Sequence, residues 1–235
     1  RPYFHEWKRC FMGGNNMKYK TVLLDLDGTI TDSGPGIMGG VRYALEKHGM
    51  DVPGEEQLRS FIGPPLKEQF RDFCGITDEE AVEMVTSYRE YYGERGIFEN
   101  RVYDGVAPLL KRLKDAGITV AMATSKPEKY AVQIAEHFGI AGYFDFIGGA
   151  LMDGTRTEKS EVIEYVLASC KVEDRSTVIM VGDRRYDIEG AKRAGLCSLG
   201  VLYGYGSREE IESAGPDYIA ETPEAAGRIL LTQES

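Results

Sequence analysis

The chain has 235 residues, of which 42% are hydrophobic, 28% charged and 10% aromatic. These are ordinary globular values, and they exclude a disordered, collagen-like or coiled-coil chain. Lys and Arg number 28 and Asp and Glu number 38, which gives a net charge of −10. Such an acidic chain is a poor candidate for binding a nucleic acid polymer or an anionic membrane. A phosphate ligand would need local positive charge from a metal, a lysine or backbone amides.

The chain shows no targeting or membrane-spanning pattern. No stretch approaches the 18 apolar residues that suggest a spanning helix. Residues 1–16 have neither the apolar core nor the cleavage site of a secretory signal. We expect them to be an upstream extension, disordered or left from cloning, before a natural start at Met17. Widely spaced cysteines without a C-x-x-C motif indicate reduced thiols and a cytoplasmic protein. They are Cys10, Cys74, Cys170 and Cys197.

Short apolar runs rich in strand-forming residues recur along the chain. They are Thr21–Leu26, Ile118–Ala123, Phe144–Ile147, Thr177–Val181 and Ser198–Leu202. Segments with apolar residues at helical spacing lie between most of them, for example Val162, Ile163 and Val166. Strands that alternate with helices indicate βαβ units. The sequence therefore predicts an α/β fold, a Rossmann-like, doubly wound parallel sheet.

One region lacks strand patterns. Between Ser33 and Asn100, helical patterns cover Gly36–His48, Pro65–Phe73 and Asp78–Tyr92. Thr77 and Glu80 fit a capping box at the start of the last of these helices. We therefore predict an inserted α-helical cap.

The domain organisation follows from this insertion. We predict an α/β core made of residues 17–32 and 101–235, with an α-helical cap domain over residues 33–100. The glycine-containing segments 34–36 and 96–100 are the expected hinges, since glycine permits backbone conformations that other residues avoid.

Acidic residues follow two of the predicted strands. Asp25 and Asp27 come at the end of the first strand, Asp183 ends the fourth, and Asp187 lies one helical turn later. Two charges about 4 Å apart repel by roughly 4 kcal/mol at an effective dielectric constant near 20. Either pair alone could be a turn former or helix cap. Together at one sheet edge, they need a cation or a proton, and such oxygen-rich clusters suit Mg²⁺.

Other polar residues are expected at the same sheet edge. Thr124 and Ser125 follow the second predicted strand, and Lys159 opens the helix before the fourth. Their position beside the four acids favours a functional site over isolated turn formers and helix caps.

These motifs resemble those of a known family. DLDGT after a strand, an apolar run ending in Thr-Ser, a downstream lysine and GDxxxD are similar to the four motifs of the haloacid dehalogenase superfamily. The resemblance extends from about Lys18 to the C-terminus. The segments GGALMDGTRTEKSEVI, VGDRRYDIEGAK and GVLYGYGSREEI resemble its phosphoglycolate phosphatase-like or 5′-nucleotidase-like branch. The family's α-helical cap corresponds to the predicted helical insertion.

The resemblance implies roles for the acids. Asp25 would be the nucleophile that forms an aspartyl-phosphate. Asp27 would protonate the leaving oxygen and then activate water. Mg²⁺ would be held by the carboxylates of Asp25 and Asp183 and by the backbone carbonyl of Asp27, with support from Asp187.

The resemblance also implies phosphoryl-binding groups. These would be the hydroxyl of Thr124 and the backbone amides of Leu26 and Ser125, while Lys159 would neutralise the nucleophile and the phosphoryl group. The lysine motif reads E-K-S-E instead of the commoner K-P-x-P. Lys126 competes for this role because it directly follows Thr124 and Ser125, and we prefer Lys159.

The cap residues that meet the substrate are less sharply marked. The segment Phe61–Leu66 contains Gly63 and Pro64, which predict a rigid turn before a helix N-terminus. We expect Gly63 and Pro64 to bind substrate, a plain inter-helix loop being the alternative. Arg42 is a weaker candidate for a substrate contact.

The predicted function is that of a Mg²⁺-dependent phosphomonoesterase acting on a small phosphorylated metabolite, either phosphoglycolate or a nucleoside 5′-monophosphate. We expect a monomer or homodimer that binds no nucleic acid polymer and no membrane. A phosphomutase of the β-phosphoglucomutase type would use the same residues. A non-enzymatic phospho-aspartate receiver would be shorter and lack a cap.

A rival from another enzyme class rests on glycines. Gly34, Gly36 and Gly39 match the dinucleotide fingerprint of an NAD-binding oxidoreductase, but the first glycine comes too late after the strand. We therefore rank this alternative last.

Overall fold

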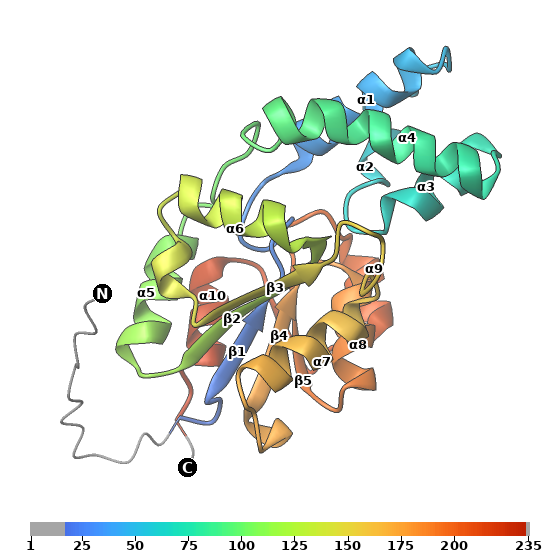
Figure 1. Ribbon diagram of the computed structural model, residues 1–235. Coiled ribbons are helices and arrows are strands. Elements are labelled where there is room, and N and C mark those ends of the chain that lie inside the picture. The colour runs from blue at the N-terminus through green and yellow to red at the C-terminus, as the bar shows by residue number, and fades with distance from the viewer. Residues whose placement is uncertain (1–16, 234–235) are drawn as a thin grey trace.

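The computed structural model describes residues 17–233, so the extension expected over residues 1–16 lies outside the described part. Six parallel strands form one sheet in the order β3-β2-β1-β4-β5-β6 (Figure 1). Their bounds are β1 Thr21–Leu24, β2 Thr119–Pro127, β3 Phe146–Ala150, β4 Val178–Gly182, β5 Cys197–Val201 and β6 Tyr218–Ala220. The predicted α/β fold is confirmed.

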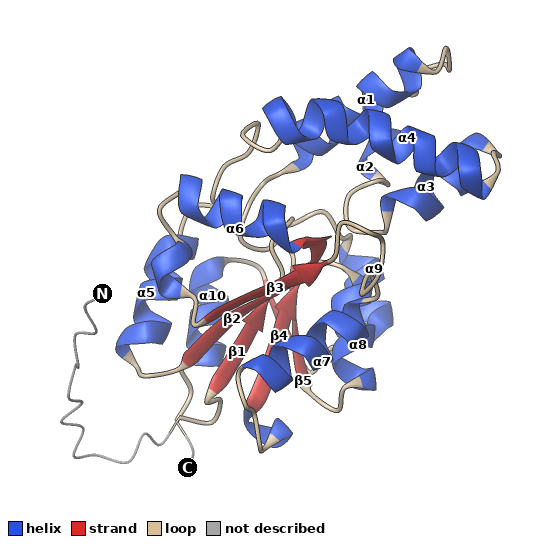
Figure 2. Ribbon diagram, in the orientation of Figure 1, coloured by secondary structure: helices blue, strands red, loops and turns tan. Residues whose placement is uncertain are grey.

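Helices cover both faces of this sheet (Figure 2). Alternate residues of β1 point to opposite faces. Val22 and Leu24 pack in the same apolar cluster as Leu110 of α5, whereas Leu23 packs in a second cluster with Val166 of α7. The helices of the core are α5 Val106–Asp115, α6 Glu128–His137, α7 Lys159–Ser169, α8 Arg185–Arg193, α9 Arg208–Ala214 and α10 Pro223–Leu230.

The strand ends differ from prediction in ways that matter for the site. β1 ends at Leu24, two residues earlier than expected, and leaves Leu26 in the following loop. β2 continues to Pro127, with an irregular register after Ala123, so that Thr124 and Ser125 lie within the strand instead of after it. The three-residue edge strand β6 was not predicted, because so short a run carries no clear pattern.

Between β1 and α5 the chain forms helices, which lie beyond the end of the sheet in Figure 1. They are α1 Gly34–Lys47, α2 Glu55–Arg59, α3 Leu66–Cys74, α4 Asp78–Tyr91 and the π-helical turn η1 Tyr92–Gly96. The capping box at the start of α4 is present: the Glu80 amide donates to Thr77 Oγ1 at 3.2 Å, and the Thr77 amide donates to Glu80 Oε2 at 2.8 Å. The helices α2 and η1 were not predicted.

The segments that enter and leave this helical region run side by side. The Gly36 amide donates to the Glu99 carbonyl at 3.1 Å. A Cβ atom on Gly36 would lie 1.9 Å from the carbonyl oxygen of Gly96, so only glycine fits at this crossing. The first expected hinge, residues 34–36, is the first turn of α1 and not a loop. The domain boundaries at residues 33 and 100 remain a prediction.

Two further expectations concern glycines and cysteines. Gly34, Gly36 and Gly39 lie within helix α1 and not in the turn after β1, so the dinucleotide fingerprint lacks its required context. In the described part of the chain, the thiols of Cys74, Cys170 and Cys197 are free. No helix within residues 17–233 has the length and apolar character needed to cross a membrane.

Candidate active site

The loop after β1 carries Asp25 and Asp27 to the carboxyl end of the sheet. The loop turns at Gly28, whose φ is 82°. A Cβ atom on Gly28 would lie 2.1 Å from Oδ2 of Asp183, so glycine serves both the positive φ and the close approach. This turn brings the acids of the first strand next to the acid that follows β4.

Three buried carboxylates meet at this point. Asp25, Asp183 and Asp187 each offer an oxygen, and these oxygens all lie within 4.8 Å of one another. Burial raises the pKa of Asp183 well above its ordinary value, and the charges of Asp187 and Asp25 raise it further. Burial also raises the pKa of Asp187 to about 6, although Lys159 opposes this. A divalent cation would relieve both effects, so this donor set fits Mg²⁺.

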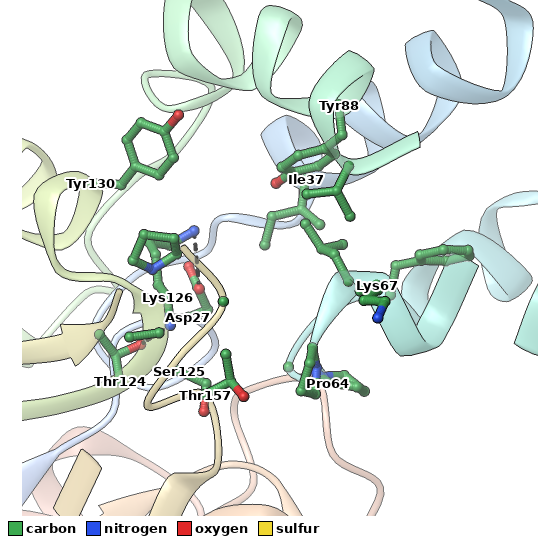
Figure 3. Close-up of a pocket in the computed structure, with 18 of the residues that line it drawn as sticks. Asp27, Ile37, Pro64, Lys67, Tyr88, Thr124, Ser125, Lys126, Tyr130 and Thr157 are labelled. Carbon is green, nitrogen blue, oxygen red and sulfur yellow. Dashed lines mark hydrogen bonds and ion pairs between the residues drawn. The ribbon is translucent and has the colours of Figure 1, made fainter. Parts of the chain in front are cut away.

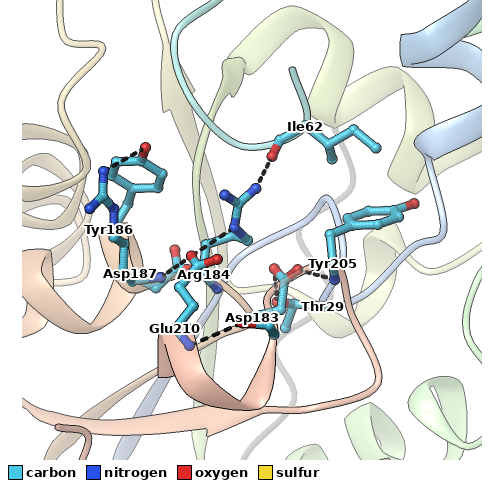
Figure 4. A network of polar contacts seen from close by, with 10 residues as sticks. Thr29, Ile62, Asp183, Arg184, Tyr186, Asp187, Tyr205 and Glu210 are labelled. Atoms are coloured by element: carbon cyan, nitrogen blue, oxygen red, sulfur yellow. Dashed lines mark hydrogen bonds and ion pairs between the residues drawn. The ribbon is translucent and has the colours of Figure 1, made fainter. Parts of the chain in front are cut away.

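Neighbouring groups fix the orientation of these acids (Figure 4). The Thr29 hydroxyl donates to Asp183 Oδ1 at 3.2 Å. The backbone amide of Tyr205 donates to Asp183 Oδ2 at 2.7 Å. The amide of Arg184, which precedes helix α8, donates to Asp187 Oδ2 at 3.1 Å. Asp183 and Asp187 are therefore each held by a backbone amide.

Lys159, the first residue of α7, lies between two of the acids. Its Nζ atom is 2.9 Å from Asp25 Oδ1 and 2.8 Å from Asp187 Oδ1. It also donates to the Ala123 carbonyl at 3.0 Å. Burial lowers the pKa of Lys159, but Asp187 and Asp25 outweigh burial and hold the pKa above its ordinary value. The lysine is therefore a fixed positive charge beside Asp25.

Lys126, the competing lysine, contacts a different acid. Its Nζ atom lies 3.1 Å from Asp27 Oδ2 and donates to the Tyr92 hydroxyl at 2.7 Å. Tyr92 belongs to η1, so this contact joins the core to the end of the helical insertion. Asp27 Oδ1 is buried and has no hydrogen-bond partner within the described chain. The geometry separates the two lysines, since Lys159 neutralises Asp25 and Lys126 holds Asp27.

Candidate phosphoryl-binding groups lie beside the acids. Thr124 is buried, and its hydroxyl oxygen accepts a hydrogen bond from the Lys126 amide at 3.2 Å. Thr124 and Ser125 both line the same cavity as Asp25 and Asp27. The Leu26 amide donates to no residue within the described chain. Thr124 and Ser125 therefore lie at the cavity with Asp25 and Asp27, and phosphoryl binding by these two residues and by the Leu26 amide remains a proposal.

A cavity that is partly open to solvent lies between these groups and the helical insertion (Figure 3). Gly63 and Pro64 line it, as predicted for substrate-facing residues. Arg42 is exposed on α1 and does not line it, so the structure gives no support to Arg42 as a substrate contact. In Figure 3, Tyr88 and Ile37 lie across the cavity from Lys126 and Asp27.

Several cavity residues had not been predicted. Tyr88 and Arg89 of α4 and Glu68 of α3 line the cavity wall formed by the insertion. Arg184 donates from the core to the carbonyl oxygen of Ile62, beside Gly63. No local motif marks these residues, because only the packing of the helical insertion over the sheet brings them to the site.

Comparisons with known proteins agree with this geometry. Residues 22–201 match the family described as haloacid dehalogenase-like hydrolase. A 5′-nucleotidase of Pseudomonas aeruginosa is 40% identical over 214 residues, which cover 91% of this chain and 96% of that protein. A phosphoglycolate phosphatase of Vibrio parahaemolyticus is 30% identical over 212 residues, 86% of this chain and 92% of the relative.

A solved structure is similarly close. The crystal structure of a predicted phosphatase from Clostridium acetobutylicum superposes with a TM-score of 0.88 and 43% sequence identity, covering 91% of this chain and 98% of the other. The fold of the present chain and its acidic cluster at the sheet edge agree with the family match. The chain belongs to the haloacid dehalogenase-like hydrolases.

Proposed function

We propose that this protein is a cytoplasmic, Mg²⁺-dependent phosphomonoesterase that acts through an aspartyl-phosphate on a nucleoside 5′-monophosphate. The observation that carries the phosphatase assignment is the buried ion pair of Asp25 with Lys159 beside the cluster of Asp25, Asp183 and Asp187. The names of the Pseudomonas and Vibrio relatives support phosphate ester hydrolysis.

The carboxylates of Asp25, Asp183 and Asp187, with the backbone carbonyl of Asp27, would hold the metal. When bound, Mg²⁺ would neutralise charge on the phosphoryl oxygens and help to orient them. A carboxylate facing a phosphate dianion about 4 Å away meets roughly 8 kcal/mol of repulsion at a dielectric constant near 20. Lys159 offsets part of this repulsion because its charge lies 2.9 Å from the Asp25 carboxylate.

The first step is attack by an oxygen of Asp25 on phosphorus, with departure of the ester oxygen. The new bond is the acyl phosphate, and the leaving oxygen takes a proton from Asp27. In the second step Asp27 removes a proton from water, which attacks phosphorus and releases inorganic phosphate and free Asp25. We assign the proton transfer to Oδ1 of Asp27, because Lys126 occupies Oδ2 while Oδ1 has no partner within residues 17–233.

The cavity favours a nucleotide over phosphoglycolate. Its wall includes Ile37, Phe61, Leu66 and Tyr88, which suit a planar, partly apolar leaving group. The relative from Pseudomonas aeruginosa named 5′-nucleotidase supports the same choice.

The test is phosphate release at neutral pH from nucleoside 5′-monophosphates, phosphoglycolate and sugar phosphates, with Mg²⁺ or with EDTA. We expect metal-dependent release that is fastest with a nucleotide and is abolished in Asp25→Asn, which keeps weak Mg²⁺ binding. Near-normal turnover by Asp25→Asn would contradict the mechanism. Faster release from phosphoglycolate would contradict the substrate assignment. Interconversion of sugar phosphates without phosphate release would instead indicate the phosphomutase alternative.

A further inference from the structure

We infer that Glu68 and Arg89 bind the hydrogen-bonding edge of a nucleobase. Glu68 would accept a hydrogen bond from a base N–H, and Arg89 would donate one to a base carbonyl or ring nitrogen. This inference rests on the proposed phosphomonoesterase function and goes beyond it. It names the residues that select the leaving group.

Both side chains line the cavity from the helical insertion without a partner of their own. Glu68 lies in the first turn of α3, and its Oε2 atom is buried with no hydrogen-bond partner in the described chain. Arg89 lies in the last turn of α4, half-buried, and makes no side-chain hydrogen bond or ion pair within residues 17–233. A buried carboxylate oxygen without a donor is costly, and a ligand N–H would remove that cost.

Neighbouring charges on the same two helices do have partners. Lys67 also lines the cavity, but its ammonium lies 2.7 Å from Asp78 Oδ2. Arg71, one turn further along α3, pairs with Asp72 at 2.9 Å. Glu68 and Arg89 therefore differ from these neighbours in having no charged partner within the described residues. The helices that carry them, α3 and α4, pack against each other.

The walls around them are apolar and aromatic. Phe61, Leu66, Val85 and Tyr88 line the cavity, and Tyr88 is held by a stacked contact with Tyr92, ring centroids 5.2 Å apart. A wall of this kind accepts a planar heterocycle and gives a sugar polyol little to bind.

A single kind of ligand fits both the apolar, aromatic cavity wall and the charges of Glu68 and Arg89. A neutral ring with an N–H donor and a carbonyl or ring-nitrogen acceptor can bind a carboxylate and a guanidinium together. The glycolate carboxylate of phosphoglycolate would be attracted by Arg89 but repelled by Glu68. A ribose phosphate without its base would leave both side chains unpaired. The pair therefore favours nucleotides.

The first experiment compares kcat/KM for a nucleoside 5′-monophosphate with kcat/KM for ribose 5-phosphate, which has the same reacting ester and no base. We expect a ratio well above one in the unaltered protein. Glu68→Gln and Arg89→Met should each reduce this ratio about tenfold or more, because each removes a charged hydrogen bond to the base. Glu83→Gln and Arg42→Met, exposed residues of the same helical insertion, are the matched controls and should leave the ratio unchanged.

The second experiment isolates the N–H. UMP or IMP, whichever is hydrolysed faster, has a base with a single N–H and is compared with its N-methyl counterpart. We expect methylation to lower kcat/KM about tenfold in the unaltered protein and to have little further effect in Glu68→Gln. Equal losses in both proteins would overturn the role of Glu68.

Failure of this inference is distinguishable from failure of the proposed function. If esters are hydrolysed but the substitutions leave the nucleotide to ribose 5-phosphate ratio unchanged, the function stands and the inference falls. If no ester is hydrolysed, the proposed function falls, and calorimetry with UMP, IMP and GMP decides the inference. Nucleotide binding that is weakened in Glu68→Gln and Arg89→Met supports it, and absence of binding overturns it.

Discussion

Lys159 and Asp25 form a buried ion pair, with Nζ 2.9 Å from Oδ1, whereas Lys126 pairs with Asp27 at 3.1 Å. This division agrees with the preference for Lys159 over Lys126 beside Asp25, and it gives Lys126 a different carboxylate as its partner. In the proposed mechanism, Lys159 faces the attacking carboxylate, and Lys126 faces the carboxyl that would handle the leaving group's proton.

The two lysines should therefore differ in their dependence on the leaving group. Lys159→Met should lower kcat about 10²-fold or more for alkyl and aryl phosphates alike, because the charge at phosphorus is lost in both. Lys126→Met should slow alkyl phosphates more than p-nitrophenyl phosphate, whose leaving group needs little protonation. The measurement is steady-state phosphate release from both ester classes. An equal loss on both classes in Lys126→Met would contradict the assignment.

The acidic cluster should make the metal-free protein less stable as the pH rises. The folded protein holds the pKa of Asp187 at about 6, above its ordinary 3.8, so between these values the folded state binds more protons than the unfolded state. The free energy of unfolding then falls as pH rises through this window, and the raised pKa of Asp183 acts in the same direction. Thermal unfolding in EDTA at several pH values measures the slope. Asp187→Asn should flatten it, and exposed Asp115→Asn should not.

Magnesium should oppose this loss. At about 100 times its Kd, a ligand bound only by the folded state adds roughly 2.7 kcal/mol of stability. For a chain of this size, that corresponds to a rise in Tm of about 5–10 °C. The rise should be larger at pH 8 than at pH 5, because the acids bind metal in their ionised form. A rise of the same size at both pH values would argue against Asp183 and Asp187 as ligands.

Tyr205 connects Asp183 with the start of the helical insertion. Its amide binds Asp183, while its hydroxyl donates to Asp32 Oδ1 at 2.6 Å and accepts from the Gly34 amide at 2.6 Å. Tyr205→Phe should reduce the free energy of unfolding by about 1–3 kcal/mol, since it leaves the Gly34 amide without its acceptor. Mg²⁺ affinity should hold, because the backbone contact to Asp183 remains. Urea unfolding measures the stability and metal titration the Mg²⁺ affinity, with half-buried Tyr43→Phe, whose hydroxyl donates only to exposed Glu90, as the control.

Arg184 fixes the cavity loop to the core. Its guanidinium donates to the Ile62 carbonyl and pairs with Glu210 at 2.9 Å. Arg184→Met should free the loop that carries Gly63 and Pro64, and raise KM several-fold with a smaller change in kcat. Arg185→Met, which removes a more exposed neighbour, is the control. An unchanged KM in Arg184→Met would show that the loop holds its position without this contact.

The segments that enter and leave the helical insertion cross at Gly36, and this crossing should tolerate no side chain there. Gly36→Ala places a Cβ atom against the Gly96 carbonyl and should cost about 1–3 kcal/mol of stability. Gly54→Ala, where a Cβ atom meets nothing within 4 Å, should be close to neutral. Urea unfolding of both variants provides the comparison. Equal stability of the two would contradict the packing at the crossing.

The sequence predicted the sheet and the acidic cluster because both depend on local patterns. Apolar runs define buried strands, and residues that follow parallel strands meet at one edge whatever the details of packing. Asp25 and Asp183 could be placed for that reason, whereas the choice of Lys159 over Lys126 rests on the family resemblance. Glu68, Arg89 and Arg184 could not, since their roles depend on how α3, α4 and the Ile62 loop pack over the sheet. Tyr205 lies in a loop after β5 whose path no pattern marks.

The meeting of Gly36 with Gly96 and Glu99 has a topological consequence. A chain segment whose two ends touch can be removed or exchanged without stretching the rest of the chain, because a short bridge closes the gap. The catalytic acids and both lysines lie outside that segment. Exchange of the insertion between relatives would therefore replace the cavity residues proposed to face the leaving group. The acids and lysines proposed to act on phosphorus would be kept.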